Sequence, residues 1–486
     1  MTQRCFRICA RLGGPALMLV AVVAAPRSAG ARPGAGPFSQ LEIDISANAS
    51  TSTMGEPEIA LNPRNPNNLF IDWTTFAYPP GPTAPPGVTY ACGGMFSMDG
   101  GVSWQAAPVT LNNCADAVAA FGTDGTLYAG GIAVVGIQTV PCGTPGSIDF
   151  AGTCIAIQAA DTLLRSTDSG QTWSAPVKMM GSASAGTFDF AAGSGNPKDT
   201  FDRPWIVVDQ STNTLYAAGH NLVDHEGFVT ASTDDAQSFG PIYAIDSPDY
   251  PSGGLFGGNI AAAKGVLAVA YTASSAPGAT CPCVIFETST DHGATFTRHV
   301  VPVVDAAAPA RPFVAANPIG KGTFALTIFD STGTENQVYV TDDFGTTWQG
   351  PAQVGEAPAN PRFKPWISFA PSGQIALVWR TLHGTSITSD PYDVWAAVGR
   401  YDGGNGVVFS APVAVSSVAA PYPPLSEGGG GDDFSFVIAD RTFVHVGWGD
   451  SRNGPTQTWY GRIPLSTFKG ITRNRVTLHR IKPPRS

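Results

Sequence analysis

The chain has 486 residues, of which only 13% are charged, while 56 are glycine and 41 are proline. Frequent glycine and proline without sustained helical periodicity favour many short strands joined by turns, and exclude a helical bundle or a coiled coil. The net charge of −10 disfavours nucleic acid and anionic membranes as partners.

Residues 1–31 have the form of a secretory signal peptide. Arg4, Arg7 and Arg11 precede an apolar run over 15–25, and the small residues Ala29-Gly30-Ala31 follow as a cleavage site. This run is too short to span a bilayer, and no other segment approaches ~20 apolar residues. We therefore expect a soluble, monomeric protein secreted to the extracellular space or the periplasm, with residues 32–40 as a spacer.

An octet of the form Ser/Thr-x-Asp-x-Gly-x-Ser/Thr-aromatic recurs along the chain, which predicts a repeat architecture. Its copies run over 97–104, 166–173, 289–296 and 341–348, with a weaker copy over 232–239 in which Ala236 replaces the glycine. In a tight turn the hydroxyl and carboxylate groups can bond backbone amides, glycine supplies a positive φ, and the aromatic side chain can be buried beneath.

These octets resemble the Asp-boxes of sialidase-like (BNR repeat) β-propellers, where they join the two outer strands of a blade. The resemblance covers nearly all of residues 40–466 and implies an all-β propeller. It also implies that the octet aspartates are structural, namely Asp99, Asp168, Asp234, Asp291 and Asp343.

Strand–turn–strand units begin near residues 55, 114, 202, 256, 311, 364 and 433, which favours seven blades over the six of catalytic sialidases. The seventh unit lacks an octet, and residues 41–45 alternate apolar and acidic side chains as a half-buried strand would. We therefore predict that this N-terminal strand closes the last blade, which removes exposed sheet edges. The propeller would span residues 41–466, followed by a basic, solvated tail over 467–486.

Six cysteines remain after the signal peptide, an even number that suits an oxidising compartment. Proximity favours the disulfides Cys92–Cys114 and Cys142–Cys154. Cys281 and Cys283 are left as a local bridge or a thiol pair.

The ligand site of a propeller usually lies on the axis, at the face where the chain enters each innermost strand and leaves the second. The resemblance implies three arginines that hold a sugar carboxylate, a tyrosine nucleophile with a glutamate, and an aspartic acid/base. The acid/base candidates are Asp202, Asp433 and Asp450. The candidate substrate-binding residues are Arg203, Arg311, Arg362, Arg380 and Arg452.

Other features favour a structural interpretation of the same residues. Asp202 with Arg203, and Asp450 with Arg452, are also spaced as ion pairs that fix a strand entry or a turn. The Arg-Ile-Pro signature of true sialidases is absent before the first octet, and its letters occur only at 462–464. No tyrosine nucleophile can be assigned.

Two functions therefore stay open, and with them the question of whether the protein is an enzyme. One is an exo-glycosidase that acts on terminal acidic sugars; the alternative is a non-catalytic propeller that binds glycan or protein, such as a cell-surface glycoconjugate. The sequence indicates no organic cofactor. Loop Asp and Asn oxygens could hold a Ca²⁺ ion, for which the sequence indicates no location.

Overall fold

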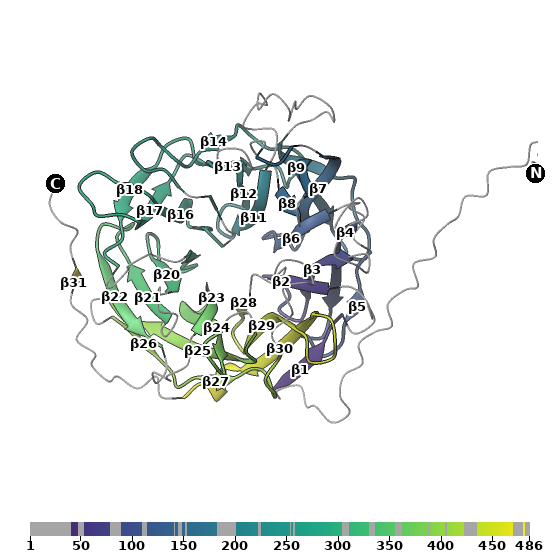
Figure 1. The fold of residues 1–486 in the computed structure, drawn as a ribbon. Coiled ribbons are helices and arrows are strands. Elements are labelled where there is room, and N and C mark those ends of the chain that lie inside the picture. Colours follow the sequence, from purple (N-terminus) through teal and green to yellow (C-terminus); the bar gives the residue numbers. More distant parts are fainter. Residues whose placement is uncertain are drawn as a thin grey trace, which may run out of the picture.

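The computed structural model describes residues 40–46, 53–77, 89–108, 114–139, 141–143, 148–150, 153–181, 201–221, 225–252, 254–255, 258–303, 311–329, 336–354, 362–386, 389–403, 406–421, 435–469 and 480–481. They form seven antiparallel sheets arranged as blades around a central axis (Figure 1). The predicted seven-bladed, all-β propeller is thereby confirmed. Within these ranges, no helix is long and apolar enough to cross a membrane.

The first three blades each run from an innermost strand beside the axis to an outer edge strand. Blade 1 contains β2 (Thr53–Leu61), β3 (Leu69–Ala77), β4 (Thr89–Ser97) and β5 (Gln105–Ala106). Blade 2 contains β6 (Cys114–Phe121), β7 (Leu127–Thr139), β9 (Thr153–Ser166) and β10 (Val177–Gly181), with β8 (Ile148–Phe150) paired to β9. Blade 3 contains β11 (Phe201–Asp209), β12 (Thr214–Asn221), β13 (Gly227–Ser232) and β14 (Tyr243–Ala244).

The next three blades follow the same order. Blade 4 contains β15 (Ile260–Ala263), β16 (Val266–Ala273), β17 (Cys283–Ser289) and β18 (Thr297–Val300). Blade 5 contains β19 (Pro312–Ala316), β20 (Phe324–Phe329), β21 (Asn336–Thr341) and β22 (Trp348–Gln353). Blade 6 contains β23 (Arg362–Phe369), β24 (Gln374–Leu382), β25 (Tyr392–Tyr401) and β26 (Val407–Phe409), with β27 (Val413–Ala414) paired to β25.

Blade 7 closes the ring with strands from both ends of the propeller. Its strands β28 (Ser435–Ala439), β29 (Phe443–Asp450) and β30 (Gln457–Pro464) are followed outwards by β1 (Leu41–Asp44). Leu41 pairs with Arg462 and Ile43 with Tyr460. The predicted closure by the N-terminal strand is confirmed.

Middle strands of the blades are apolar on both faces because each blade is packed between two neighbours. In β16, for example, every residue from Val266 to Tyr271 is at most 1% exposed. A strand buried on both faces loses the alternation of apolar and polar residues that a half-solvated strand has. The core therefore consists of the layers between blades.

Each octet forms the turn between the third and fourth strands of its blade; we call these the octet turns. In blade 2, Asp168 Oδ1 accepts hydrogen bonds from Ser166 Oγ (2.8 Å) and from the Thr172 amide (2.8 Å), while Oδ2 accepts one from Thr172 Oγ1 (2.6 Å). These bonds, led by that of the Thr172 hydroxyl, lower the pKa of Asp168 to about 2. The carboxylate is thus engaged within its own turn.

The octet turn of blade 1 also rests on blade 7. Arg462 Nη1 on β30 donates to the Gly100 carbonyl at 2.6 Å. Gly101 has a φ of +82°, and a Cβ there would collide with the Tyr460 hydroxyl. Glycine is therefore required both by the turn and by the close approach of the two blades. The contact supports the ring at its point of closure.

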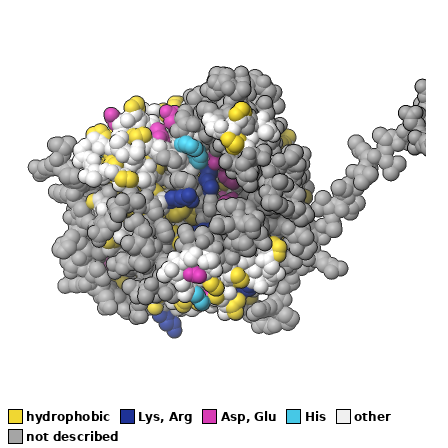
Figure 2. Space-filling model, in the orientation of Figure 1, with side chains coloured by type: hydrophobic (Ala, Val, Ile, Leu, Met, Phe, Trp, Pro, Cys, Tyr) yellow, Lys and Arg dark blue, Asp and Glu magenta, His cyan; other side chains and the backbone are white. Residues whose placement is uncertain are grey.

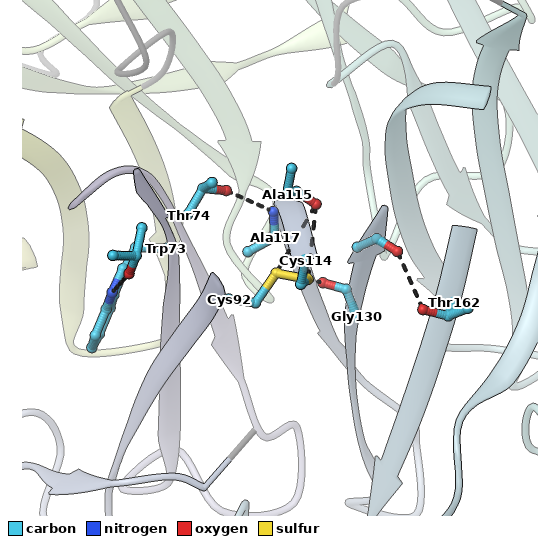
Figure 3. The surroundings of a disulfide bond; sticks show 10 residues. Trp73, Thr74, Cys92, Cys114, Ala115, Ala117, Gly130 and Thr162 are labelled. Atoms are coloured by element: carbon cyan, nitrogen blue, oxygen red, sulfur yellow. Dashed lines mark hydrogen bonds between the residues drawn. A yellow bond between two sulfur atoms is a disulfide. The ribbon is translucent and has the colours of Figure 1, made fainter. Parts of the chain in front are cut away.

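Among the described residues there are three disulfides, and both pairings favoured by proximity are found. Cys92 on β4 is bonded to Cys114 on β6, which ties blade 1 to blade 2 (Figure 3). Beside this bond the Ala117 amide of β6 donates to Thr74 Oγ1 of β3 at 3.1 Å. The second pair is Cys142–Cys154 in blade 2, and Cys281–Cys283 forms a local bridge at the start of β17.

Replacing Cys92 and Cys114 together by alanine should lower the free energy of unfolding by about 3 kcal/mol, because this bond closes a loop of 22 residues. Urea unfolding followed by tryptophan fluorescence measures the loss. The matched control replaces Cys281 and Cys283, which are only two residues apart, and should lose much less. Equal losses for the two pairs would contradict this expectation.

The basic C-terminal segment contributes one short strand. β31 (Arg480–Ile481) pairs with β22, with Ile481 opposite Trp348 and Arg480 opposite Gln349. We expected this segment to be solvated rather than docked on the acidic body of the protein, whereas these two residues extend the outer edge of blade 5. An unpaired edge strand offers free backbone groups, and pairing with β31 covers part of that edge.

Candidate functional site

Aromatic side chains from four blades meet on the axis. Trp205 of blade 3 lies 4.8 Å, centre to centre, from Trp366 of blade 6, which also contacts Phe313 (4.8 Å) and Phe436 (5.0 Å). Gly258 of blade 4 lies beside them with a φ of +64°, and a Cβ there would come within 2.6 Å of the Trp366 ring. These four rings, the axial plug, obstruct the centre, and a channel of about 240 Å³ is lined by the inner strands towards their C-terminal ends.

In four inner strands, a charged residue lies just before the plug in the direction of the chain. The backbone of each of these residues has a left-handed conformation. We call Glu56 (φ 58°), Asp116 (φ 47°), Arg203 (φ 55°) and Lys364 (φ 49°) the bulge residues. Each lies at a break in the pairing register with the second strand. Left-handed backbone costs a non-glycine residue on the order of 1–3 kcal/mol, and such strain and bulges occur preferentially at functional sites.

Three of the bulge residues converge. Glu56, Asp116 and Arg203, from blades 1, 2 and 3, line one cavity of about 10 Å³, with Trp205 as part of its wall. That volume is about one water molecule. The space-filling view shows a wider hollow at the centre of the ring, in which basic, acidic and histidine side chains are exposed together (Figure 2).

Asp202 lies next to this cavity, one residue before the bulge in β11. Its side chain is 31% exposed, and Oδ2 lies 3.7 Å from His220 Nε2. The other ring nitrogen of His220, Nδ1, is 2.7 Å from the Leu255 carbonyl. Burial lowers the pKa of His220, although Asp202 acts in the opposite direction. Asp202 is thus a carboxyl group that solvent can reach, beside an imidazole whose charged form is disfavoured by burial.

Asp161 of β9 is a fully buried carboxyl group behind the same cluster. It is 0% exposed, and neither of its oxygens has a hydrogen-bond partner among the described residues. Burial, and then the carboxylates of Asp202 and Asp116, raise the pKa of Asp161 well above its usual value. The cluster therefore combines a buried carboxyl group whose protonated form is favoured with carboxyl groups that lie nearer to solvent.

Replacing Asp161 by asparagine should stabilise the protein increasingly as the pH rises. A carboxyl group with a raised pKa in the folded state contributes stability that is full below its unfolded pKa, ~3.9, and is lost as the pH rises through the folded value. Asparagine has no proton to lose. Thermal unfolding of both proteins at pH 5 and pH 8 checks this, and a gap in Tm that does not widen at pH 8 would contradict it. Asp168→Asn, which removes a carboxylate of lowered pKa, should destabilise at both values.

Two of the predicted residues, Asp450 and Arg452, lie over the outer strands of blade 7. Arg452 Nη2 is 2.6 Å from Asp450 Oδ2, and Arg452 Nη1 is 2.8 Å from Glu42 Oε1 on β1. The guanidinium also lies 4.2 Å from the centre of the Trp459 ring. Asp450 is fully buried and accepts a further bond from Trp448 Nε1 at 3.1 Å. This pair fixes the turn after β29 to the strand that closes the ring.

The remaining predicted residues are not gathered at one point. Arg380 is fully buried between blades 6 and 7, where Nε donates to Ser435 Oγ at 2.8 Å and the guanidinium lies over the Tyr392 ring. Arg311 is exposed just before β19. Arg362 begins β23 opposite Thr381, and nothing is described of its side chain. Asp433 lies outside the described residues.

Sequence reasoning missed Asp116 and Asp161. Asp116 occupies the same place in β6 that Glu56 and Arg203 occupy in their strands, but alanine follows it where proline follows the other two. Alignment of the inner strands alone would have found it. Asp161 interrupts a segment of small and apolar residues in β9, the third strand of blade 2. A charged residue inside a strand that is buried on both faces is the sequence signal that could have identified it.

Within the described part of the chain, no group of three or more His, Cys, Asp or Glu side chains is arranged to hold a metal ion. These residues therefore give no support for a Ca²⁺ site.

The chain matches no protein-family model and no curated protein sequence. Among solved structures it is similar to the GH93 α-L-arabinofuranosidase of Fusarium graminearum, at 14% identity over 89% of this chain and 99% of that chain, with a TM-score of 0.46. The Hadza microbial sialidase Hz136 is 14% identical over 80% of this chain and 75% of its own, with a TM-score of 0.44. A protein of unknown function from Dyadobacter fermentans is 12% identical over 87% and 97%, with a TM-score of 0.43. Likenesses at this level carry no argument about the activity.

Proposed function

We propose that the protein is a secreted exo-glycosidase that removes terminal acidic sugars at the axial face of the propeller. The observation that carries the proposal is the set of four bulge residues, because four charged side chains in strained backbone occupy the same place in four inner strands. Strain of this kind persists where a site requires a particular side-chain direction.

The carboxylates at this face can supply the chemistry of glycoside hydrolysis. That reaction uses one carboxylic acid to protonate the leaving oxygen and a second carboxylate as base or nucleophile. We assign the first role to Asp202, which solvent reaches, and the second to Asp116, which lines the cavity with Arg203. The buried acid Asp161 lies behind both and adds no further negative charge while it holds its proton.

The cations of the axial face support an acidic substrate. Acidic bulge residues come from blades 1 and 2, whereas Arg203 and Lys364 come from blades 3 and 6, and Arg311 precedes the inner strand of blade 5. A guanidinium group binds a carboxylate through two parallel hydrogen bonds. The sugar carboxylate would therefore face blades 3 to 6, with its glycosidic bond towards Asp202 and Asp116.

The axial plug supports action on chain ends. Ring centres only 4.8 to 5.0 Å apart are in van der Waals contact, so a saccharide that enters the hollow cannot pass through the ring. A pocket closed at its floor accepts a terminal residue, whereas cleavage within a chain needs a groove open at both ends.

Hydrolysis of fluorogenic glycosides tests the proposal. The panel would contain a sialoside and a glucuronide beside a galactoside and an arabinofuranoside. We expect release of the fluorophore from an acidic glycoside and little from the neutral ones. Turnover restricted to neutral glycosides would overturn the substrate class, and no turnover of any member would overturn the enzymatic function.

Binding of a glycan without turnover is a second candidate function, and the environment of Tyr271 favours it. The Tyr271 hydroxyl donates to the Tyr250 carbonyl at 3.3 Å, and Glu287 is held by Arg298, whose Nε lies 2.6 Å from Glu287 Oε2. Burial first, and Glu287 next, raise the pKa of Tyr271, and a phenol in that state is a poor nucleophile. Retention on an immobilised sialoside without product formation would favour this candidate.

Export and the domain boundaries are part of the proposal. Three disulfides suit an oxidising compartment, and residues 1–31, which lie outside the described residues, would be removed on export. The mature protein would then consist of the spacer over 32–40, the propeller over 41–466 and the basic tail over 467–486. The N-terminal sequence of the secreted protein checks the first boundary.

A further inference from the structure

A groove between blades 2 and 3 lies on the face opposite the axial site. It has a volume of about 370 Å³, within the range of pockets that bind small molecules. Asp124, in the turn between β6 and β7, forms one wall, and the octet turns of blades 2 and 3 form the others. Because inner and third strands run in the same direction, these turns all lie at the far ends of their strands, away from the bulge residues.

Polar and aromatic side chains line this groove. Arg165 Nη1 donates to the Asp235 carbonyl at 3.2 Å, whereas its Nε is buried and has no hydrogen-bond partner among the described residues. Asp235 Oδ1 accepts from Asn213 Nδ2 at 2.7 Å. The Asp124 carboxylate accepts from the amide and hydroxyl of Thr126. The side chains are thus held in place before any ligand is bound.

Trp173, which closes the octet of blade 2, differs from its equivalents in blades 1 and 5. Trp104 and Trp348 are fully buried, whereas Trp173 is partly exposed and lines the groove. Its position is supported from beneath by an edge-to-face contact with Phe70 at 5.8 Å. A partly exposed indole ring that lines a groove offers apolar surface against which a sugar ring can pack.

Charge in the groove selects against anions. Among the residues that line the groove, the two carboxylates Asp124 and Asp235 outnumber the single cation, Arg165, although Arg64, outside the lining, also acts on Asp124. Burial first, and then Asp235 and Asp124, raise the pKa of the nearby Tyr128 hydroxyl. Two carboxylates are good acceptors for the hydroxyl groups of a neutral sugar, whereas they repel a sugar acid.

We propose that this groove is a second saccharide site, which binds neutral sugar residues by stacking on Trp173 and by hydrogen bonds to Asp124, Arg165 and Asp235. The proposal rests on different residues from the axial site and does not depend on hydrolysis there. It gives the protein a surface for neutral sugar residues on the face opposite the one to which an acidic terminus is assigned.

The test places a large side chain at the exposed rim of the groove, where it would fill the space proposed for the sugar. Thr167 is an exposed residue of the blade 2 octet turn that lines the groove, so Thr167→Tyr should occupy the space without disturbing the core. Thr290→Tyr is the matched control, since Thr290 is the equivalent exposed residue of the blade 4 octet turn. The full chain carrying Asp202→Asn, which is expected to slow turnover, would be applied to an array of galactose-, glucose- and arabinose-terminated oligosaccharides beside their sialylated forms.

We expect binding to neutral oligosaccharides that Thr167→Tyr weakens at least tenfold and that Thr290→Tyr leaves unchanged; tenfold corresponds to 1.4 kcal/mol. Absence of neutral binding would overturn the proposal, as would binding that Thr167→Tyr does not change. In a protein that retains Asp202, Thr167→Tyr should leave the rate of hydrolysis of a small fluorogenic glycoside unchanged. Failure of the axial proposal would appear as no hydrolysis in either protein and would leave the array result standing.

Discussion

Replacing Asp202 by asparagine is expected to lower kcat for an acidic glycoside by about 10² to 10⁴, the usual contribution of a general acid. Asparagine keeps the shape of the side chain and can still contact His220, but it has no proton to transfer to the leaving oxygen. Steady-state kinetics on the fluorogenic panel measure the loss, and the Tm of the variant shows whether the fold is intact.

The same experiment separates binding from chemistry. Arg203→Ala should raise KM more than it lowers kcat, since the guanidinium is assigned to the sugar carboxylate. Arg400→Ala is the control, because Arg400 is an exposed arginine on β25 of blade 6. A folded Asp202→Asn protein with unchanged kcat would remove Asp202 from the acid role, and equal effects of the two arginine variants would remove Arg203 from substrate binding.

Removal of β1 should produce the largest loss of stability. Leu41, Ile43 and Ile45 are 6%, 8% and 1% exposed, and burial of each side chain contributes roughly 2 kcal/mol. A chain that begins at residue 47 also leaves the edge of β30 without a partner, which promotes pairing between molecules. We expect a lower Tm and dimers or aggregates in size-exclusion chromatography, relative to a chain that begins at residue 32.

A peptide of residues 38–47 provides the control for this truncation. Added in excess, it should occupy the edge of β30 and restore both the Tm and the monomer. The same peptide with Ile43→Asp should fail to do so, because a charge would be buried against Tyr460 and its neighbours. A truncated chain as stable as the longer one would show that β1 does not hold the ring closed.

The scaffold could be predicted from the sequence because its signals are local. Each octet lies within eight residues and defines one turn, and the hairpin units repeat with similar spacing. Even the closure of the ring could be predicted from local patterns, because blade 7 lacks an octet and residues 41–45 have the pattern of a strand. Disulfide pairs such as Cys92–Cys114 followed from short separations along the chain.

The arrangement of side chains could not be read in this way. Asp450 and Arg452 are spaced like a candidate acid and its neighbouring cation, but Glu42 holds Arg452 over the outer strands, from a position 410 residues away in the sequence. The position of Arg380 was equally hard to predict from the sequence, because Ser435 of the next blade holds Arg380 in the interface between blades 6 and 7. Which residues face the axis depends on bulges, and a bulge changes the register without a reliable sequence signature.

The closure of blade 7 also determines where attached segments leave the molecule. Leu41 begins the outermost strand of blade 7, beside Arg462 on β30. This position lies outside the axial hollow and the groove between blades 2 and 3. A domain or a surface tether fused ahead of residue 41 would therefore leave both faces accessible to ligands, whereas the chain after β30 continues to β31 at the outer edge of blade 5.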